Sequence, residues 1–138
     1  LMLKIETPLA LRNLPALIVE AGGRVPVGVM IARGDLAVEI GFERLSEIQE
    51  EVLWLCEAAE VPVVWATQVL EGMVKEGQAS RAEMTDAAMS QRAECVMLNK
   101  GPHLVQAVTF LRDVLMRMDR HTSKKSPRLG ALGLWHDL

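Results

Sequence analysis

The chain has 138 residues, of which 50% are hydrophobic and 24% are charged, with a formal net charge of −3. This length allows one domain with a real core, and the hydrophobic share argues against intrinsic disorder. The slightly acidic balance gives no electrostatic basis for binding nucleic acid, and no run reaches the roughly 18 apolar residues of a membrane-spanning helix. We therefore expect a globular protein that acts on neither nucleic acid nor membrane.

Four apolar runs, each followed by polar residues, recur along the chain. They span residues 1–5, 27–32, 61–66 and 95–98. Continuous apolar runs without strict alternation are typical of parallel strands that are buried on both faces. We therefore predict four parallel β-strands.

The ends of these runs are evenly spaced. They fall at Glu6, Asp35, Thr67 and Asn99, which are 29, 32 and 32 residues apart. A (β/α)8 barrel of about 250 residues has about 31 residues per strand–helix unit, and its active site lies at the carboxyl ends of the strands. The spacing predicts an α/β fold of four consecutive βα units, half of a TIM (β/α)8 barrel, with polar residues on its functional rim.

The chain begins inside the first apolar run and without a methionine, which we interpret as a fragment boundary. A half-barrel exposes two sheet edges with unpaired backbone groups, and such edges pair readily with another chain. We therefore expect either pairing with a missing first half or self-association.

The first connection between strands carries two competing helix signals. Thr7 and Pro8 open a helical turn, because threonine caps helices and proline is tolerated at the first helical position. Pro15 would interrupt a longer helix, so we expect the main helix over residues 14–21, with Asn13 as its cap.

Later helices follow from apolar spacing and capping residues. One apolar stripe begins at Phe42, and the stripe of the last helix includes Val108. Ser80 and Glu83 match a capping box that starts a helix through about residue 91. We assign residues 1–120 to the half-barrel and residues 121–138 to a C-terminal tail.

The two cysteines, Cys56 and Cys95, lie far apart, with no CxxC pair and no histidine at ligand spacing. A structural zinc site is therefore not expected. Isolated thiols are typical of a reducing compartment, so we expect a cytoplasmic protein.

Lys4 and Glu6 project to the same face at the end of the first strand, because they lie two residues apart. Lysine supplies a point positive charge for phosphoryl oxygens, and glutamate supplies a hard oxygen ligand for Mg²⁺. The pair suits a site for phosphate and metal; an ordinary surface ion pair is the alternative.

The other strand ends carry candidates of the same kind. Asp35 offers a second carboxylate, and Gly34 lets a ligand approach the backbone, although Asp35 could simply cap the next segment. Thr67 offers a hydroxyl, which could instead bond local backbone. Lys100 lies beside a glycine just before a helix, where it could hold an anion or remain a solvated lysine.

Together these segments resemble the second half of the catalytic barrel of the pyruvate kinases, as a divergent member. The similarity covers roughly residues 3–117 and is carried, in order, by LKIE, VMIARGDLAVEI, PVVWATQVLE, SRAE and VML. The ARGDL and ATQ segments are its most specific parts.

The resemblance implies transfer of a phosphoryl group from phosphoenolpyruvate to ADP, giving pyruvate and ATP. It implies that Lys4 stabilises the transferring group and that Glu6 and Asp35 hold Mg²⁺, or Mn²⁺ in its place. Gly34 and Asp35 would contact phosphoenolpyruvate, and Thr67 would lie beside the enolpyruvate. Lys4 and Thr67 are the implied catalytic residues.

Two departures from the family pattern bear on this expectation. The family usually has Ser-Gly-Glu-Thr after its last barrel strand, whereas this chain has Asn99-Lys100-Gly101-Pro102, so nucleotide and phosphate handling differs unless Lys100 supplies it. We also interpret the chain as lacking the family's C-terminal regulatory domain and the first half of the barrel, which in relatives supplies an arginine for the phosphate and the potassium ligands. K⁺ dependence therefore stays open, and we expect no turnover from this chain alone.

Two other functions stay open. A non-catalytic pyruvate kinase-like module would bind a phosphorylated ligand or support assembly, in line with the changed loop at Lys100. A metal-dependent lyase would use the same carboxylates to stabilise an enolate. The ATQ segment favours the kinase family.

Overall fold

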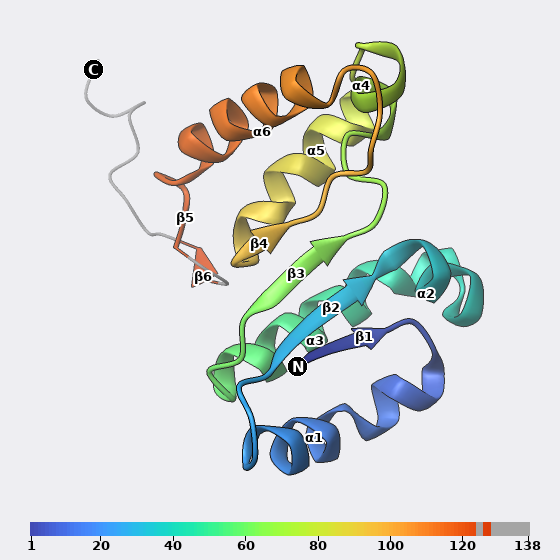
Figure 1. Ribbon diagram of the computed structural model, residues 1–138, viewed down its shortest axis with the longest axis vertical. Coiled ribbons are helices and arrows are strands. Elements are labelled where there is room, and N and C mark those ends of the chain that lie inside the picture. Colours follow the sequence, from blue (N-terminus) through green and yellow to red (C-terminus); the bar gives the residue numbers. More distant parts are fainter. Residues whose placement is uncertain (124–125, 128–138) are drawn as a thin grey trace, which may run out of the picture.

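The computed structural model describes residues 1–123 and 126–127 of the chain. Its main sheet has four parallel strands in the order β1-β2-β3-β4, which is also their order along the chain (Figure 1). The strands are β1 (Met2–Ile5), β2 (Gly28–Ala32), β3 (Val63–Ala66) and β4 (Cys95–Val96). The predicted α/β class and the four parallel strands are confirmed.

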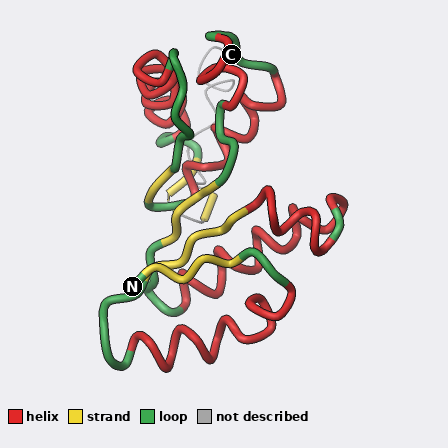
Figure 2. The backbone as a smooth tube through the Cα atoms, turned by 45° about the vertical axis from the view of Figure 1, so that its right-hand side comes forward, coloured by secondary structure: helices red, strands yellow, loops and turns green. Residues whose placement is uncertain are grey.

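Helices follow each of the four strands (Figure 2). They are α1 (Pro8–Gly22), α2 (Arg33–Ile40), α3 (Leu45–Ala58), α4 (Glu71–Glu76), α5 (Arg81–Met89) and α6 (Leu104–Met118), with 3-10 turns at Phe42–Arg44 and Ser90–Arg92. Sequential parallel strands joined through helices are the arrangement of successive units in a (β/α)8 barrel. No helix in the described part of the chain is long and apolar enough to cross a membrane.

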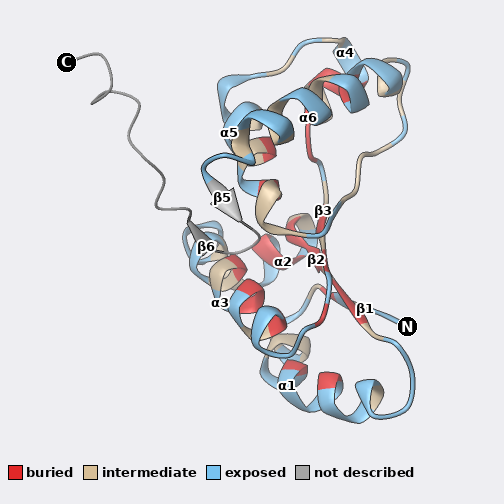
Figure 3. Ribbon diagram, turned by 90° about the vertical axis from the view of Figure 1, so that its left-hand side faces the viewer, coloured by how far each residue is buried: buried red, intermediate tan, exposed pale blue. Residues whose placement is uncertain are grey.

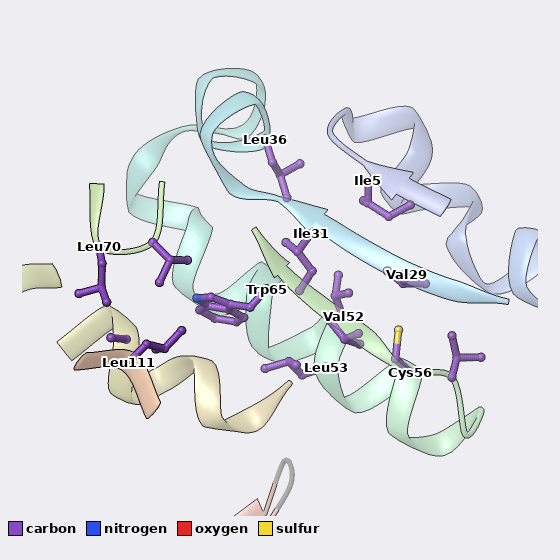
Figure 4. Close-up of a cluster of buried hydrophobic side chains, with 14 of the residues drawn as sticks. Ile5, Val29, Ile31, Leu36, Val52, Leu53, Cys56, Trp65, Leu70 and Leu111 are labelled. Carbon is purple, nitrogen blue, oxygen red and sulfur yellow. The ribbon is translucent and has the colours of Figure 1, made fainter. Parts of the chain in front are cut away.

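The hydrophobic core lies between the strands and the helices that pack on one side of them. Figure 3 shows α1, α2 and α3 together on one side of β1, β2 and β3. Ile31 and Trp65 point from the sheet toward Val52 and Leu53 of α3 (Figure 4), and Trp65 has no exposed surface. This packing holds the strand ends, and the residues that follow them, in fixed relative positions.

The opposite face of the sheet is less buried, which corrects the prediction that both faces are covered. Lys4, Met30, Val64 and Cys95 are neighbours in register across the four strands. Lys4 and Cys95 are exposed, and Met30 and Val64 are half-buried. The helices of the described chain therefore cover the face of Ile31 and Trp65, whereas the buried positions on the opposite face are the small residues Gly28, Ala32 and Ala66.

The first helix is longer than predicted. It begins at Pro8, where the Thr7 hydroxyl accepts a hydrogen bond from the Ala10 backbone N–H, and it continues through Pro15 to Gly22. Proline removes one helical N–H donor, but Leu14 and Ile18 on either side of it are buried against the core. Tertiary packing of this face outweighs the local cost, so the prediction of a helix start after Asn13 was wrong.

Two apolar stripes are also placed differently. Gly41 has a φ of +92° and ends α2, so Phe42 lies in a separate 3-10 turn and its side chain is 74% exposed. In α6 the buried positions are Ala107 and Leu111, whereas Val108 is 52% exposed. The small side chain of Ala107 lets α6 approach closely, which a spacing argument based on large residues does not detect.

The capping box of α5 is confirmed: the Ser80 hydroxyl accepts from the Glu83 N–H, and the Glu83 carboxylate accepts from the Ser80 N–H. The helix ends at Met89, slightly earlier than predicted. Of the predicted tail, β5 (Thr122–Ser123) pairs antiparallel with β6 (Ser126–Pro127). The predicted tail residues 124–125 and 128–138 lie outside the described residues.

Candidate active site

The ends of β1 and β2 bring three predicted site residues together. The Lys4 ammonium donates a hydrogen bond to the Glu6 carboxylate, and its Nζ lies 3.7 Å from Asp35 Oδ2. Lys4 lies on β1 and Glu6 directly follows this strand, while Asp35 lies in the first turn of α2 directly after β2. Parallel strands end at the same edge of the sheet, which is why residues about 30 positions apart meet here.

The lysine of this cluster is held in its charged form. The hydrogen bond to Glu6 raises the pKa of Lys4 above its ordinary value of 10.5; desolvation opposes this shift, and the charges of Glu6 and Asp35 add to it. The side chains of Lys4, Glu6 and Asp35 are 50%, 40% and 66% exposed. The cluster is therefore open to solvent, and a ligand can reach all three groups.

The two carboxylates fit a divalent cation of the Mg²⁺ type. Such a cation commonly takes one or two protein carboxylates and fills its other positions with water and substrate phosphate. Among the described residues, no group of three or more His, Cys, Asp or Glu side chains is arranged to hold a metal ion. Two carboxylates alone would leave the remaining positions of such a cation to water or other ligands.

The end of β3 contributes Thr67, which contacts the segment that follows β2. Thr67 Oγ1 accepts a hydrogen bond of 3.3 Å from the backbone N–H of Gly34. A Cβ at position 34 would lie only 2.9 Å from this hydroxyl oxygen, so glycine is required for the close approach. The hydroxyl keeps its own proton for donation to a ligand, because it acts as an acceptor toward Gly34.

Beneath Thr67 lies a buried charged pair that sequence reasoning did not single out. Arg33 is 8% exposed, and both terminal nitrogens of its guanidinium pair with the carboxylate of Asp86 in α5. The one local signal was an arginine directly after a continuous apolar strand, where a charged side chain must find a partner. The partner could not be read from the sequence, because it lies 53 residues further along.

A cavity of about 500 Å³ opens beside these residues. Gly34 and Thr67 line it together with Arg33, Phe42 and Asp86, among others. Gly34 and Thr67 therefore border an open space, in which a small ligand can contact Thr67.

The fourth strand end is organised differently. Asn99 donates a 2.8 Å hydrogen bond to Glu71, and Glu71 also pairs with Lys75 at 2.6 Å. The hydrogen bond from Lys75 lowers the pKa of Glu71, and the pKa of Lys75 is raised in turn. Lys100 is exposed and follows β4, which lies at the opposite edge of the sheet from β1 and its Lys4 cluster.

Comparison with known proteins identifies similar chains. The model of the pyruvate kinase barrel domain matches residues 1–103. A pyruvate kinase of Encephalitozoon cuniculi is 34% identical over 137 residues, covering 95% of this chain and 31% of that relative. A pyruvate kinase of Thermotoga maritima is 36% identical over 123 residues, covering 85% of this chain and 25% of that relative. The chain thus spans about a third or less of the length of these relatives.

Proposed function

The chain belongs to the pyruvate kinase family, and we propose that it forms the metal and phosphoenolpyruvate side of a phosphotransferase site. One observation carries this proposal. Lys4, Glu6 and Asp35, from two strand ends, form a single ion-pair cluster that is open to solvent. A cation next to two hard oxygen ligands is the combination that a phosphate ester with its metal requires.

Phosphoryl transfer depends on positioning and charge neutralisation more than on covalent chemistry by the protein. Glu6 and Asp35 would hold Mg²⁺ or Mn²⁺, which when bound neutralises the negative charge of the phosphorylated ligand. The Lys4 ammonium would contact the oxygens of the transferring group as a point charge. The Thr67 hydroxyl would donate a hydrogen bond to the enolpyruvate part of the ligand, next to the backbone of Gly34.

Lys4 pairs with both carboxylates and offsets part of their combined negative charge. We propose that Lys4 leaves them when a divalent cation takes its place and then turns to the phosphoryl oxygens. Its flexible stem allows this movement, and its exposed position imposes little desolvation cost. The same three residues would thus serve both the resting and the loaded site.

We further propose that these four βα units are the second half of a (β/α)8 barrel. In support, the sheet face that carries Met30 and Val64 has no helix on it among the described residues, and the inner wall of a barrel has this character. Further units, from the same protein or from a second copy, would cover this face and both sheet edges. They would also supply the remaining ligands for phosphate and any K⁺, so we expect no turnover from this chain alone.

A second candidate function is a module that binds a phosphorylated ligand without transferring phosphate. The fourth strand end favours it, because Asn99 is engaged by Glu71 while Lys100 is exposed away from the cluster. Under this alternative, the protein would lack a site for the nucleotide that accepts the phosphoryl group. For either function we propose a cytoplasmic location, in line with the wide spacing of Cys56 and Cys95 in the sequence.

Binding of Mn²⁺ and phosphoenolpyruvate to the 138-residue chain tests the shared part of both functions. We expect Mn²⁺ titration to show one site that is lost in Glu6→Gln and in Asp35→Asn but kept in Glu39→Gln, an exposed carboxylate of α2. Phosphoenolpyruvate should bind only with the metal present. Unchanged Mn²⁺ binding in both site variants would refute the proposal.

The two functions then separate in an activity assay. In a protein that supplies the remaining barrel units, the kinase proposal expects ATP formation from phosphoenolpyruvate and ADP that Lys4→Ala abolishes. Metal-dependent phosphoenolpyruvate binding without any such turnover would favour the binding module.

A further inference from the structure

We propose that the buried pair Arg33–Asp86 is a positioning device that fixes the backbone and hydroxyl of Thr67 for ligand binding; this inference rests on the proposed function of Thr67. Arg33 and Asp86 would contact no ligand themselves. They would act through the strand-end segment that they hold.

Arg33 binds the backbone on either side of the strand end. Its Nε donates to the carbonyl of Ala66 at 2.9 Å, and its Nη2 donates to the carbonyl of Thr67 at 2.8 Å. Two successive carbonyl groups are thus held by one planar side chain. A guanidinium presents its donors in a rigid fork, so it fixes the direction of both carbonyls together.

Asp86 and Trp65 fix the guanidinium in turn. The Asp86 carboxylate pairs with both terminal nitrogens of Arg33, with Nη2 to Oδ2 at 2.8 Å. Trp65 Nε1 donates to Asp86 Oδ1 at 3.2 Å, and the Arg33 Cζ lies 4.7 Å from the centroid of the Trp65 ring. The orientation of Arg33 is therefore set by β3 and α5 at the same time.

The chain neighbour of Arg33 completes the arrangement. Arg33 holds the Thr67 carbonyl, while the N–H of Gly34, the next residue, donates to Thr67 Oγ1. The backbone and side chain of Thr67 are thus bound by two consecutive residues of one helix start. A shift of Arg33 would move both contacts together, and misplacement by about 1 Å can cost a site about a hundredfold in rate.

Burial of the pair does not by itself argue for positioning, because a buried ion pair is a weak argument for stability or for function. A comparable pair exists elsewhere: Arg92 and Glu50 are 15% and 27% exposed, against 10% and 27% for Arg33 and Asp86. That pair joins the 3-10 turn Ser90–Arg92 to α3. It provides a control of similar burial.

The test measures amide hydrogen exchange in the full 138-residue chain by NMR. In Asp86→Asn and in Arg33→Lys we expect protection of the Gly34 amide to fall about tenfold relative to the amide of Ile31 in β2, as coupling within one hydrogen-bond network predicts. Glu50→Gln should leave this ratio unchanged. If the pair only stabilised the fold, protection of the Gly34 and Ile31 amides from exchange would fall by the same factor. That result, or a Gly34 amide that is unprotected in the unsubstituted chain, would overturn the proposal.

A binding measurement connects the device to the proposed function. Asp86→Asn should weaken phosphoenolpyruvate binding in the presence of Mn²⁺ about tenfold while the affinity for Mn²⁺ itself stays the same, and it should add little to Thr67→Val. If the unsubstituted chain binds no phosphoenolpyruvate, the proposed function is wrong. The exchange rate of the Gly34 amide then still tests whether Arg33 and Asp86 position Thr67. Equal weakening by Glu50→Gln would contradict the proposal.

Discussion

The first and third strand ends of this sheet are built in opposite ways. At the end of β1, Lys4 and Glu6 form a charged cluster with Asp35 from the neighbouring strand end, and the three side chains are between 40% and 66% exposed. At the end of β3, the charged pair below Thr67 is largely buried, with side chains of Arg33 and Asp86 that are 10% and 27% exposed. The exposed cluster can exchange partners when a ligand arrives, whereas the buried pair can only keep its geometry or lose it.

This difference separates ligand binding from stability along one edge of the sheet. Exposed ion pairs contribute little to folding, because water screens them and long side chains lose entropy in forming them. Removal of one partner of a buried pair leaves an uncompensated charge and is strongly destabilising. Substitutions at the two strand ends should therefore give clearly different results.

The largest expected effect is on stability and comes from Arg33→Ala. It removes the donor to the Ala66 and Thr67 carbonyls and the charged partner of Asp86, which keeps its hydrogen bond from Trp65. We therefore expect the free energy of unfolding to fall by about 3–5 kcal/mol. Urea denaturation followed by circular dichroism measures this. Arg112→Ala removes an arginine whose side chain is 65% exposed and should cause no measurable change. A similar loss of unfolding free energy in both variants would contradict the prediction that the buried arginine contributes more to stability than the exposed one.

Gly34→Ala should give the next largest effect. The new methyl group would lie 2.9 Å from Thr67 Oγ1, and relief of such overpacking costs about 1–3 kcal/mol, reduced by the better helix propensity of alanine. The matched control is Gly22→Ala in the last turn of α1, where no atom lies within 4 Å of the new Cβ. Thermal denaturation should show a lower midpoint for the first variant and an equal or higher midpoint for the second. A lower midpoint for both would contradict the steric argument.

A smaller effect concerns Glu83, which anchors the start of the helix that carries Asp86. Partial burial disfavours its charge, but hydrogen bonds from the backbone N–H groups of Ser80 and Gly72 outweigh this and lower its pKa below the ordinary 4.5. Because the pKa is lower in the folded state, the stabilisation is present above pH 4.5 and is lost as the pH falls through the folded value. Glu83→Gln should cost about 1 kcal/mol at pH 7 and less at pH 3.

Urea midpoints at several pH values check this prediction. The difference between the unsubstituted chain and Glu83→Gln should shrink on acidification, whereas Glu39→Gln, an exposed glutamate of α2, should show no such trend. A difference that is constant with pH would indicate that Glu83 acts by shape and not by charge.

The same contrast explains what could be predicted from the sequence. Apolar runs and their polar ends are local patterns, so the parallel strands and the residues Lys4, Glu6 and Asp35 were accessible, as was the capping box at Ser80. The confirmed family membership agrees with the resemblance in these segments. Local patterns identify residues at the carboxyl ends of strands, because this position can be read without knowing which distant residues they contact.

What could not be predicted depends on residues that are distant in the chain. The sequence near Arg33 does not indicate that this residue forms an ion pair with Asp86. Likewise, the sequence near Pro15 does not indicate that Leu14 and Ile18 are buried deeply enough to keep the helix continuous. One-sided burial of the sheet likewise depends on which faces the helices cover. Tertiary packing decides each of these points, and a single sequence does not display it.

The smallest effect on stability should come from Lys4→Met, and it is also the sharpest test of the exposed cluster. Because its pKa lies above 10.5, Lys4 is fully charged at neutral pH and competes with any divalent cation for Glu6 and Asp35. Its loss should leave the thermal midpoint unchanged, raise the affinity for Mn²⁺ severalfold and abolish phosphoenolpyruvate binding. Lys75→Met, which removes an exposed lysine paired with Glu71, should change none of these quantities. Weaker Mn²⁺ binding in Lys4→Met would mean that Lys4 organises the two carboxylates instead of competing for them, and the proposed exchange of partners would be wrong.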